Sequence, residues 1–169
     1  MVCPLFLLFL QNGSIIFLEL PYNLFIYGEN RIVHNDKPWG QHLILDIGDC
    51  NANICRKSAI AAFVKELVEA IDMKAYGEPV IVHFAEHSHE ATGYSLVQLI
   101  ETSAITGHFS DNNRDAYLDI FSCKPFANDI VIQVVKKHFA PQRIHVASLE
   151  RGVNLSVKVP FQKVSADAL

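Results

Sequence analysis

The sequence predicts an α+β fold, a two-layer sandwich in which two helices cover one face of a mostly antiparallel sheet. Three observations support this prediction. Short runs rich in β-branched and aromatic residues alternate with turn residues, two longer stretches carry apolar residues at helical spacing, and the segments follow the order β-α-β-β-β-α-β. The 169 residues, 50% hydrophobic and 19% charged, suffice for one well-packed domain.

The first half of this domain is predicted to be a strand, a helix and a strand. Residues 43–47 form an apolar run that ends at Gly48-Asp49, which is typical of a buried strand followed by a turn. Residues 56–73 carry apolar side chains three or four positions apart, as on one helical face: Ile60, Phe63, Val64, Leu67, and Ala70 or Ile71. Residues 79–84 follow the Tyr76-Gly77 turn as a second strand.

The second half is predicted to hold three more strands and a second helix. Residues 93–100 and 116–122 are strand-like, and the polar stretch 102–114 between them reads as a connection with a turn at Asp-Asn-Asn. Residues 129–138 are predicted to be an amphipathic helix with its inner face at Ile130, Val131, Val134 and Val135. Residues 144–149 complete the sheet.

Charge and cysteine content exclude several functional classes. The net charge is −4 and no run of Lys or Arg is present, which argues against a nucleic-acid or anionic-membrane partner and favours a small-molecule ligand. Four cysteines without a Cys-x-x-Cys pair predict a reducing, cytoplasmic location. The apolar run at residues 2–10 lacks a basic flank and is too short to span a bilayer.

Three reactive residue types lie close together in the sequence. Ser103, His108 and Cys123 offer a hydroxyl, a base and a thiol between two strand-like runs. Because a hairpin folds back on itself, we expect Ser103 at the end of the first strand, His108 in the connection and Cys123 at the end of the second strand to approach one point. Each also has an ordinary interpretation: a strand-ending serine, a hydrogen-bonded imidazole and a small buried thiol.

These residues carry a family resemblance. His108 lies five residues after Ser103, and Asp119-Ile120-Phe121-Ser122-Cys123 places the thiol twenty residues after it. At these spacings, and in Gln41-His42-Leu43-Ile44-Leu45-Asp46, the chain resembles the prokaryotic S-adenosylmethionine decarboxylase proenzymes. The resemblance spans roughly residues 39–151, which we interpret as the catalytic domain. Residues 1–38 are then an N-terminal extension and 152–169 a C-terminal tail.

The resemblance implies a mechanism in which the chain makes its own cofactor. Cleavage between Thr102 and Ser103 would convert Ser103 into a covalent pyruvoyl group, with His108 as the base that removes the Cα proton. The pyruvoyl ketone would condense with the substrate amine and accept the electrons released as CO2 leaves. Cys123 would then protonate the substrate carbon. By the same resemblance the protein is a homodimer of cleaved protomers that supplies decarboxylated S-adenosylmethionine for spermidine biosynthesis.

Several positions depart from the family pattern. Thr102 stands where the family has Glu, Ala104 where it has His, and residues 109–112 read Phe-Ser-Asp-Asn in place of Thr-Trp-Pro-Glu. In the family these positions border the substrate, so two alternatives to S-adenosylmethionine decarboxylation stay open. One is a pyruvoyl-dependent decarboxylase of ornithine or arginine. The other is a non-catalytic, nucleoside-binding homologue.

Candidate ligand contacts complete the predicted site. Phe84 and Phe109 are candidates to stack on an adenine ring, and Glu101 is a candidate to contact a cationic or ribose-bearing ligand. The best metal-binding pattern is His83, His87 and His89, but it lies at a strand end and contains carboxylates that would solvate a loop. We therefore expect no metal.

Overall fold

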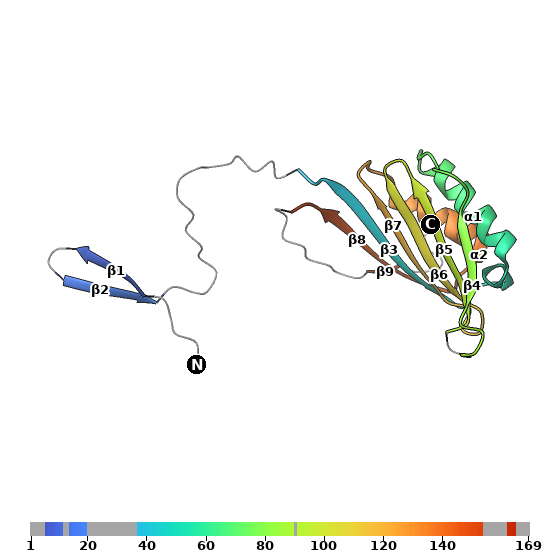
Figure 1. Ribbon diagram of the computed structural model, residues 1–169, viewed down its shortest axis with the longest axis horizontal. Helices are drawn as coiled ribbons and strands as arrows, with labels where there is room; N and C mark the ends of the chain where they lie inside the picture. Colours follow the sequence, from blue (N-terminus) through green and yellow to red (C-terminus); the bar gives the residue numbers. More distant parts are fainter. Residues whose placement is uncertain (1–5, 12–13, 20–36, 90, 154–161, 165–169) are drawn as a thin grey trace. The chain divides into compact units, whose positions relative to one another are not determined.

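The computed structural model describes residues 6–11, 14–19, 37–89, 91–153 and 162–164 (Figure 1). The chain divides into two compact units, Met1–Asn35 and Asp36–Leu169. In the first unit, β1 (Phe6–Gln11) and β2 (Ser14–Glu19) form an antiparallel hairpin with Leu8 opposite Phe17. The predicted boundary at residue 38 stays a prediction.

The second unit is a sheet of strand order β4-β5-β6-β7-β3-β8-β9 in which every pair is antiparallel. Two helices, α1 (Lys57–Ala70) and α2 (Asn128–Phe139), lie on one side of it (Figure 1). The strands are β3 (Gly40–Gly48), β4 (Val80–Phe84), β5 (Gly93–Ile100), β6 (Ser103–Ser110), β7 (Ala116–Ser122), β8 (Arg143–Arg151) and β9 (Gln162–Val164). The predicted two-layer α+β class is confirmed.

The core lies between the sheet and the helices. Alternate residues of β3, Leu43, Leu45 and Ile47, are buried, as period-two alternation requires of a half-covered strand. The α1 face predicted from apolar spacing is fully buried at Phe63 and Leu67. In α2 the buried residues are Val131, Ile132, Val134, Val135 and Phe139, whereas Ile130 is only partly buried.

The predicted polar connection at residues 102–114 is wrong, because most of it is strand β6. Its helix-facing positions are Ile105, Gly107 and Phe109, of which Ile105 and Phe109 are completely buried. A Cβ on Gly107 would come within 2.7 Å of Leu118 Cδ2 and 3.1 Å of the Phe109 ring, so a larger residue there would require these side chains to shift. This glycine interrupts the apolar alternation of β6, a strand that the predicted order lacks.

The tail also contributes to the sheet. β9 pairs with β8, with Val164 opposite Ile144. The alternating residues 153–159 also predict an edge strand, but all of them except Val153 lie outside the described residues. Within the described residues, no helix has the length and apolar character needed to cross a membrane.

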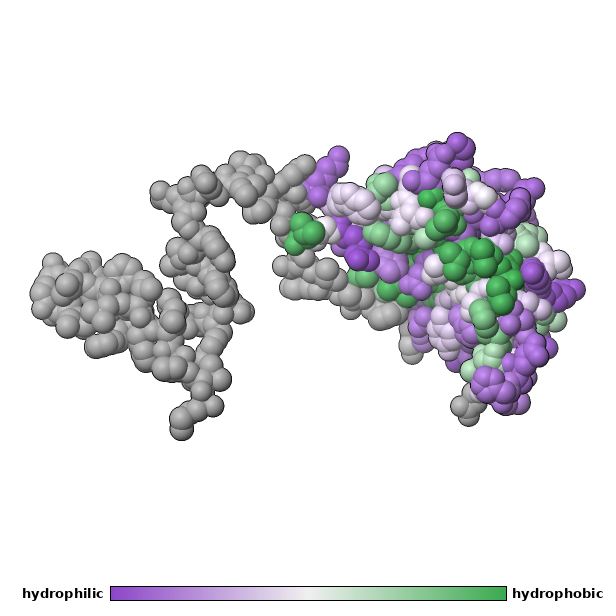
Figure 2. Space-filling model, in the orientation of Figure 1, coloured by the Kyte–Doolittle hydropathy of each residue, from purple (hydrophilic) through white to green (hydrophobic). Residues whose placement is uncertain are grey.

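The sheet face opposite the helices carries exposed hydrophobic residues. Residues paired across antiparallel strands share a face, and Val80 is paired with Val97, whose neighbours Leu96 and Gln98 point into the core. The exposed hydrophobic residues of β4, β5 and β7 on this open face are Val80, Val82, Phe84, Val97, Leu99 and Tyr117. Figure 2 shows hydrophobic residues gathered over the part of the sheet where β4 and β5 lie.

Candidate active site

The predicted cleavage position lies in a tight hairpin turn. Glu101 and Thr102 form the turn between β5 and β6, and Ser103 begins β6 opposite Ile100. Ser103 has φ +155°, a backbone region that residues with a side chain rarely occupy. Such strain costs on the order of 1–3 kcal/mol and is concentrated at functional positions. The turn therefore presents a strained serine immediately after the Thr102 carbonyl.

Cys123 lies next to this turn, as predicted. Ser103 is paired with Ser122 across β6 and β7, and the Cys123 backbone N–H donates to the Thr102 carbonyl oxygen at 3.1 Å. This hydrogen bond draws electron density away from the carbonyl carbon, which favours attack by a nucleophile. Cys123 itself is exposed and free. The structure thus brings the hydroxyl, the carbonyl and the thiol-bearing residue together.

The other two described cysteines differ from Cys123 in their environment. Cys50 is 5% exposed, and its burial, with Asp115 and Asp49 nearby, raises the pKa of the thiol to about 12. Burial is also the main cause that raises the pKa of the Cys55 thiol, with Asp111 adding to it. Both thiols are disfavoured as proton donors or nucleophiles. Of the three described cysteines, Cys50 is buried, Cys55 is partly buried and Cys123 is exposed.

His108 is not brought to Ser103 within one protomer. It lies five residues further along β6, which at roughly 3.3 Å per residue separates the two by about 16 Å. The expectation that all three side chains approach one point is therefore wrong for His108, because β6 is extended where a folded connection was predicted. Instead, His108 Nδ1 lies 3.0 Å from the Ser95 hydroxyl, opposite it on β5.

Ser95 is a polar residue of the site that the sequence analysis missed. Its hydroxyl can orient the His108 ring and fix which ring nitrogen carries the proton. The signal that would have found it is the pairing of β5 with β6, which places Ser95 directly opposite His108. If residues 103–110 are not recognised as a strand, nothing in the sequence places Ser95 near His108.

The three predicted ligand contacts have different surroundings. Phe84 is 52% exposed at the end of β4, but it lies opposite Gly93, at the other end of β5 from Ser103, so it is not brought to the cleavage turn within one protomer. Glu101 is exposed and pairs with Lys74, Oε1 to Nζ at 2.6 Å. Phe109 is completely buried, with ring centroids 6.5 Å from Phe63 and 5.6 Å from Phe139. Phe109 is therefore a core residue, and its prediction as a stacking partner is corrected.

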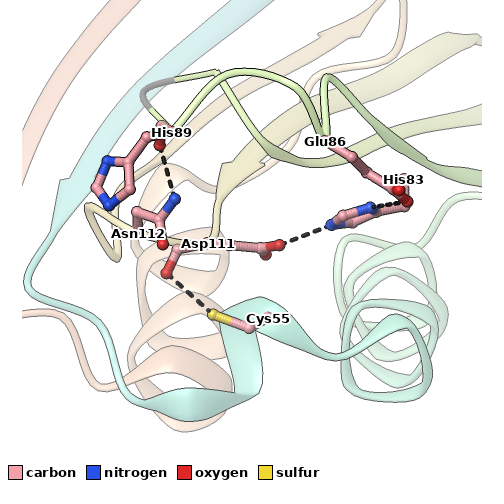
Figure 3. Close-up of polar contacts among 6 residues, drawn as sticks. All are labelled: Cys55, His83, Glu86, His89, Asp111 and Asn112. Atoms are coloured by element: carbon pink, nitrogen blue, oxygen red, sulfur yellow. Dashed lines mark hydrogen bonds and ion pairs between the residues drawn. The ribbon is translucent and has the colours of Figure 1, made fainter.

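His83, on β4, forms hydrogen bonds with the carboxylates of Asp111 and Glu86 (Figure 3). His83 Nε2 lies 2.7 Å from Asp111 Oδ2 in the β6 to β7 turn, and His83 Nδ1 lies 3.1 Å from Glu86 Oε1. The backbone carbonyl of His89 accepts a hydrogen bond from Asn112 Nδ2 at 2.7 Å. No group of three potential metal ligands is found among the described residues.

This network predicts a pH-dependent contribution to stability. The hydrogen bond to Asp111, and secondarily that to Glu86, raises the pKa of His83 above its ordinary value. The stabilisation is therefore complete below about pH 6.5, the unfolded value, and is lost as pH rises through the folded value. Relative to the parent, His83→Gln is expected to lower the melting temperature most near pH 5.5 and progressively less as the pH rises.

The measurement compares melting temperatures across the pH range in a Ser103→Ala background, so that every sample has one covalent form. His87→Gln is the matched control, because His87 is exposed and has no ion-pair partner in the described part of the chain. A His83→Gln deficit that stays constant from acid to alkaline pH would contradict the prediction.

Comparisons with known proteins identify the family. The chain is similar in fold to the solved adenosylmethionine decarboxylase of Aquifex aeolicus, with a TM-score of 0.59 and 21% identity over 72% of this chain and 99% of that one. S-adenosylmethionine decarboxylase proenzymes of Clostridium botulinum strains Langeland and Loch Maree are 28% and 26% identical over 115 residues, 67% of this chain and 94% of theirs.

By architecture the chain is thus a two-layer α+β protein of the type seen in that solved decarboxylase. The profile described as S-adenosylmethionine decarboxylase matches residues 41–152, which is more than half of the chain. The chain belongs to the S-adenosylmethionine decarboxylase family.

Proposed function

We propose that this protein is a self-processing S-adenosylmethionine decarboxylase whose pyruvoyl cofactor is derived from Ser103. The observation that carries the proposal is the turn itself, where Ser103 has φ +155° and the preceding Thr102 carbonyl accepts the Cys123 N–H. A serine hydroxyl one residue after a polarised carbonyl, in a strained backbone, fits the residue that such a cofactor requires. Family membership supports the same assignment.

Processing needs only groups that the chain supplies and one water molecule. The Ser103 hydroxyl attacks the Thr102 carbonyl carbon, the C–N bond breaks, and the hydroxyl proton passes to the freed amine, which leaves an ester. A base then removes the Ser103 Cα proton, and the Thr102 carboxylate departs with the ester oxygen. Water replaces the nitrogen of the resulting dehydroalanine, so ammonia and a pyruvoyl group remain.

The mature site would use the same neighbourhood. A pyruvoyl group supplies a carbonyl that accepts the electrons released when a bound amino acid loses CO2. Cys123 is exposed and directly follows the strand residue opposite Ser103, so its thiol is suited to deliver a proton there. Glu101 is exposed beside Ser103 and remains a proposed substrate contact. Phe84 lies opposite Gly93, at the other end of β5 from Ser103, so as a proposed substrate contact it would act from a second protomer. The free thiols are consistent with the proposed cytoplasmic location.

We further propose that the base acts between protomers of a homodimer. His108 and Ser95 lie on the open sheet face, about 16 Å along β6 from Ser103. Exposed Val80, Val97 and Leu99 give the same face an apolar surface that a second copy would cover. In a two-fold symmetric, face-to-face dimer, the His108 of each protomer can approach the Ser103 of the other.

A complementation experiment tests this arrangement. His108→Ala alone is expected to stall as the ester, which hydroxylamine cleaves to release a fragment beginning with serine. Mixed dimers of His108→Ala and Ser103→Ala chains contain one site with both Ser103 and His108. About half of the chains form such dimers on random assembly. Part of the His108→Ala chain should therefore mature when the two are coexpressed, as measured by intact mass.

Different affinity tags on the two chains verify that mixed dimers form. If the tagged mixed dimers contain only uncleaved His108→Ala chains, the base acts within its own protomer and the proposed arrangement fails. If His108→Ala matures alone at the parent rate, His108 has no part in processing.

Substrate identity is tested by release of labelled CO2. The purified, processed protein is expected to release it from carboxyl-labelled S-adenosylmethionine and not from labelled ornithine or arginine. If CO2 is released from ornithine or arginine instead, that amino acid is the substrate, which is the alternative suggested by the departure of residues 109–112 from the family pattern. A processed protein inactive on all three substrates would leave the proposed activity without support.

A further inference from the structure

The segment that follows α1 lies beside the turn that holds the bond to be cleaved. β4 begins only at Val80, opposite Val97, so it leaves the end of β5 uncovered. Residues 74–76 cover that edge, through the Tyr76 N–H to the Leu99 carbonyl at 2.8 Å and the Glu101 N–H to the Lys74 carbonyl at 3.0 Å. We call residues 72–76 the clamp segment.

Side chains extend the contact to both sides of the cleavage position. The Thr102 hydroxyl donates to Met73 Sδ at 3.2 Å, and the Ser122 hydroxyl lies 3.8 Å from the same sulfur. Asp72 pairs with Lys124, which follows β7, with Oδ2 to Nζ at 2.5 Å. The clamp segment therefore joins the residue before the scissile bond to the strand opposite Ser103.

Met73 is the member of the clamp segment that is anchored to the core. It is partly buried and packs against the core cluster, whereas Lys74 and Glu101 form an ion pair whose side chains are 75% and 55% exposed. Exposed ion pairs contribute little because solvent screens them and ordering the side chains costs entropy. Among these contacts, the one from Thr102 to Met73 is the best suited to hold the turn in place.

We propose that Met73 is a positioning residue for self-cleavage, which it serves by holding the Thr102 hydroxyl; this rests on the proposed function. The Thr102 peptide unit is fixed at two points, its carbonyl by the Cys123 N–H and its side chain by Met73 Sδ. Because the threonine side chain is stiff about χ1, holding its hydroxyl also restricts the backbone. This restraint would keep the carbonyl in one orientation relative to Ser103, as attack by its hydroxyl requires.

The test measures the rate of cleavage by intact mass after synthesis in a cell-free system. Met73→Leu conserves volume and removes the sulfur acceptor, and Thr102→Val conserves shape and removes the donor. Each is expected to slow cleavage roughly two- to twelvefold, which corresponds to one lost hydrogen bond. The double variant should be no slower than the slower single variant, because both remove the same contact.

Thr102→Ser provides the rescue, since it keeps the hydroxyl and should cleave within about twofold of the parent rate. Melting temperatures of the same variants in a Ser103→Ala background show whether a slower cleavage rate results from a loss of folding stability. Additive effects of the two single variants, or a Thr102→Ser chain as slow as Thr102→Val, would overturn the role of Met73. Unchanged rates in both single variants would do the same while leaving the proposed function intact. A parent chain that never cleaves would overturn both proposals.

Discussion

Ser103→Ala is expected to remain a single chain of 169 residues under conditions in which the parent separates into fragments spanning residues 1–102 and 103–169. Alanine has no oxygen to attack the Thr102 carbonyl, so neither the ester nor the later elimination can occur. Intact mass under denaturing conditions measures the result. The smaller parent fragment should also resist sequential amino-terminal degradation, because a pyruvoyl group carries no amine.

Ser110→Ala is the matched control for this variant. It makes the same substitution on the same strand, β6, but removes a buried hydroxyl that has no hydrogen-bond partner among the described residues. We expect it to mature at the parent rate, since no partner is left unsatisfied. Cleavage before residue 103 in the Ser103→Ala protein would point to a contaminating protease and would remove the basis for the proposed cofactor.

The helices and strands whose buried residues form an uninterrupted apolar pattern were predictable from the sequence. The spacing of Phe63, Val64 and Leu67 located α1, because a helix on a sheet must bury one stripe of its surface. β6 was not predicted, since its inward positions read Ile, Gly and Phe, and the glycine packs closely against Leu118. A glycine in the core carries no hydrophobic signal of its own.

The candidate site was predictable to the same extent. Ser103 and Cys123 were correctly expected to be close, because both flank strands that pair with each other. The position of His108 depended on whether residues 103–110 are extended or folded back, and local turn propensity favoured the wrong answer. Phe109 was misassigned for the same reason, since only the alternation of β6 reveals that its ring faces the helices.

Cys123→Ala is expected to be cleaved, with at most a modest delay, but to lose most of its turnover. Cleavage uses the Cys123 backbone N–H, which alanine retains, whereas protonation of the substrate carbon would use the thiol, which alanine lacks. Removing a positioned proton donor typically slows a reaction by about 10² to 10⁴. Turnover is measured as labelled CO2 release per cleaved chain, with cleavage confirmed by mass.

Two further variants separate chemistry from packing at this position. Cys123→Ser should restore little turnover, because an alcohol is a far weaker acid than a thiol, although it resembles the thiol in size and hydrogen bonding. Cys50→Ala, at a buried thiol whose pKa is raised to about 12, should reduce stability yet keep turnover. Loss of turnover at Cys123 with cleavage preserved would therefore assign the proton transfer to the exposed thiol. Full turnover in a cleaved Cys123→Ala enzyme would instead mean that only the backbone of this residue takes part, as the donor to the Thr102 carbonyl.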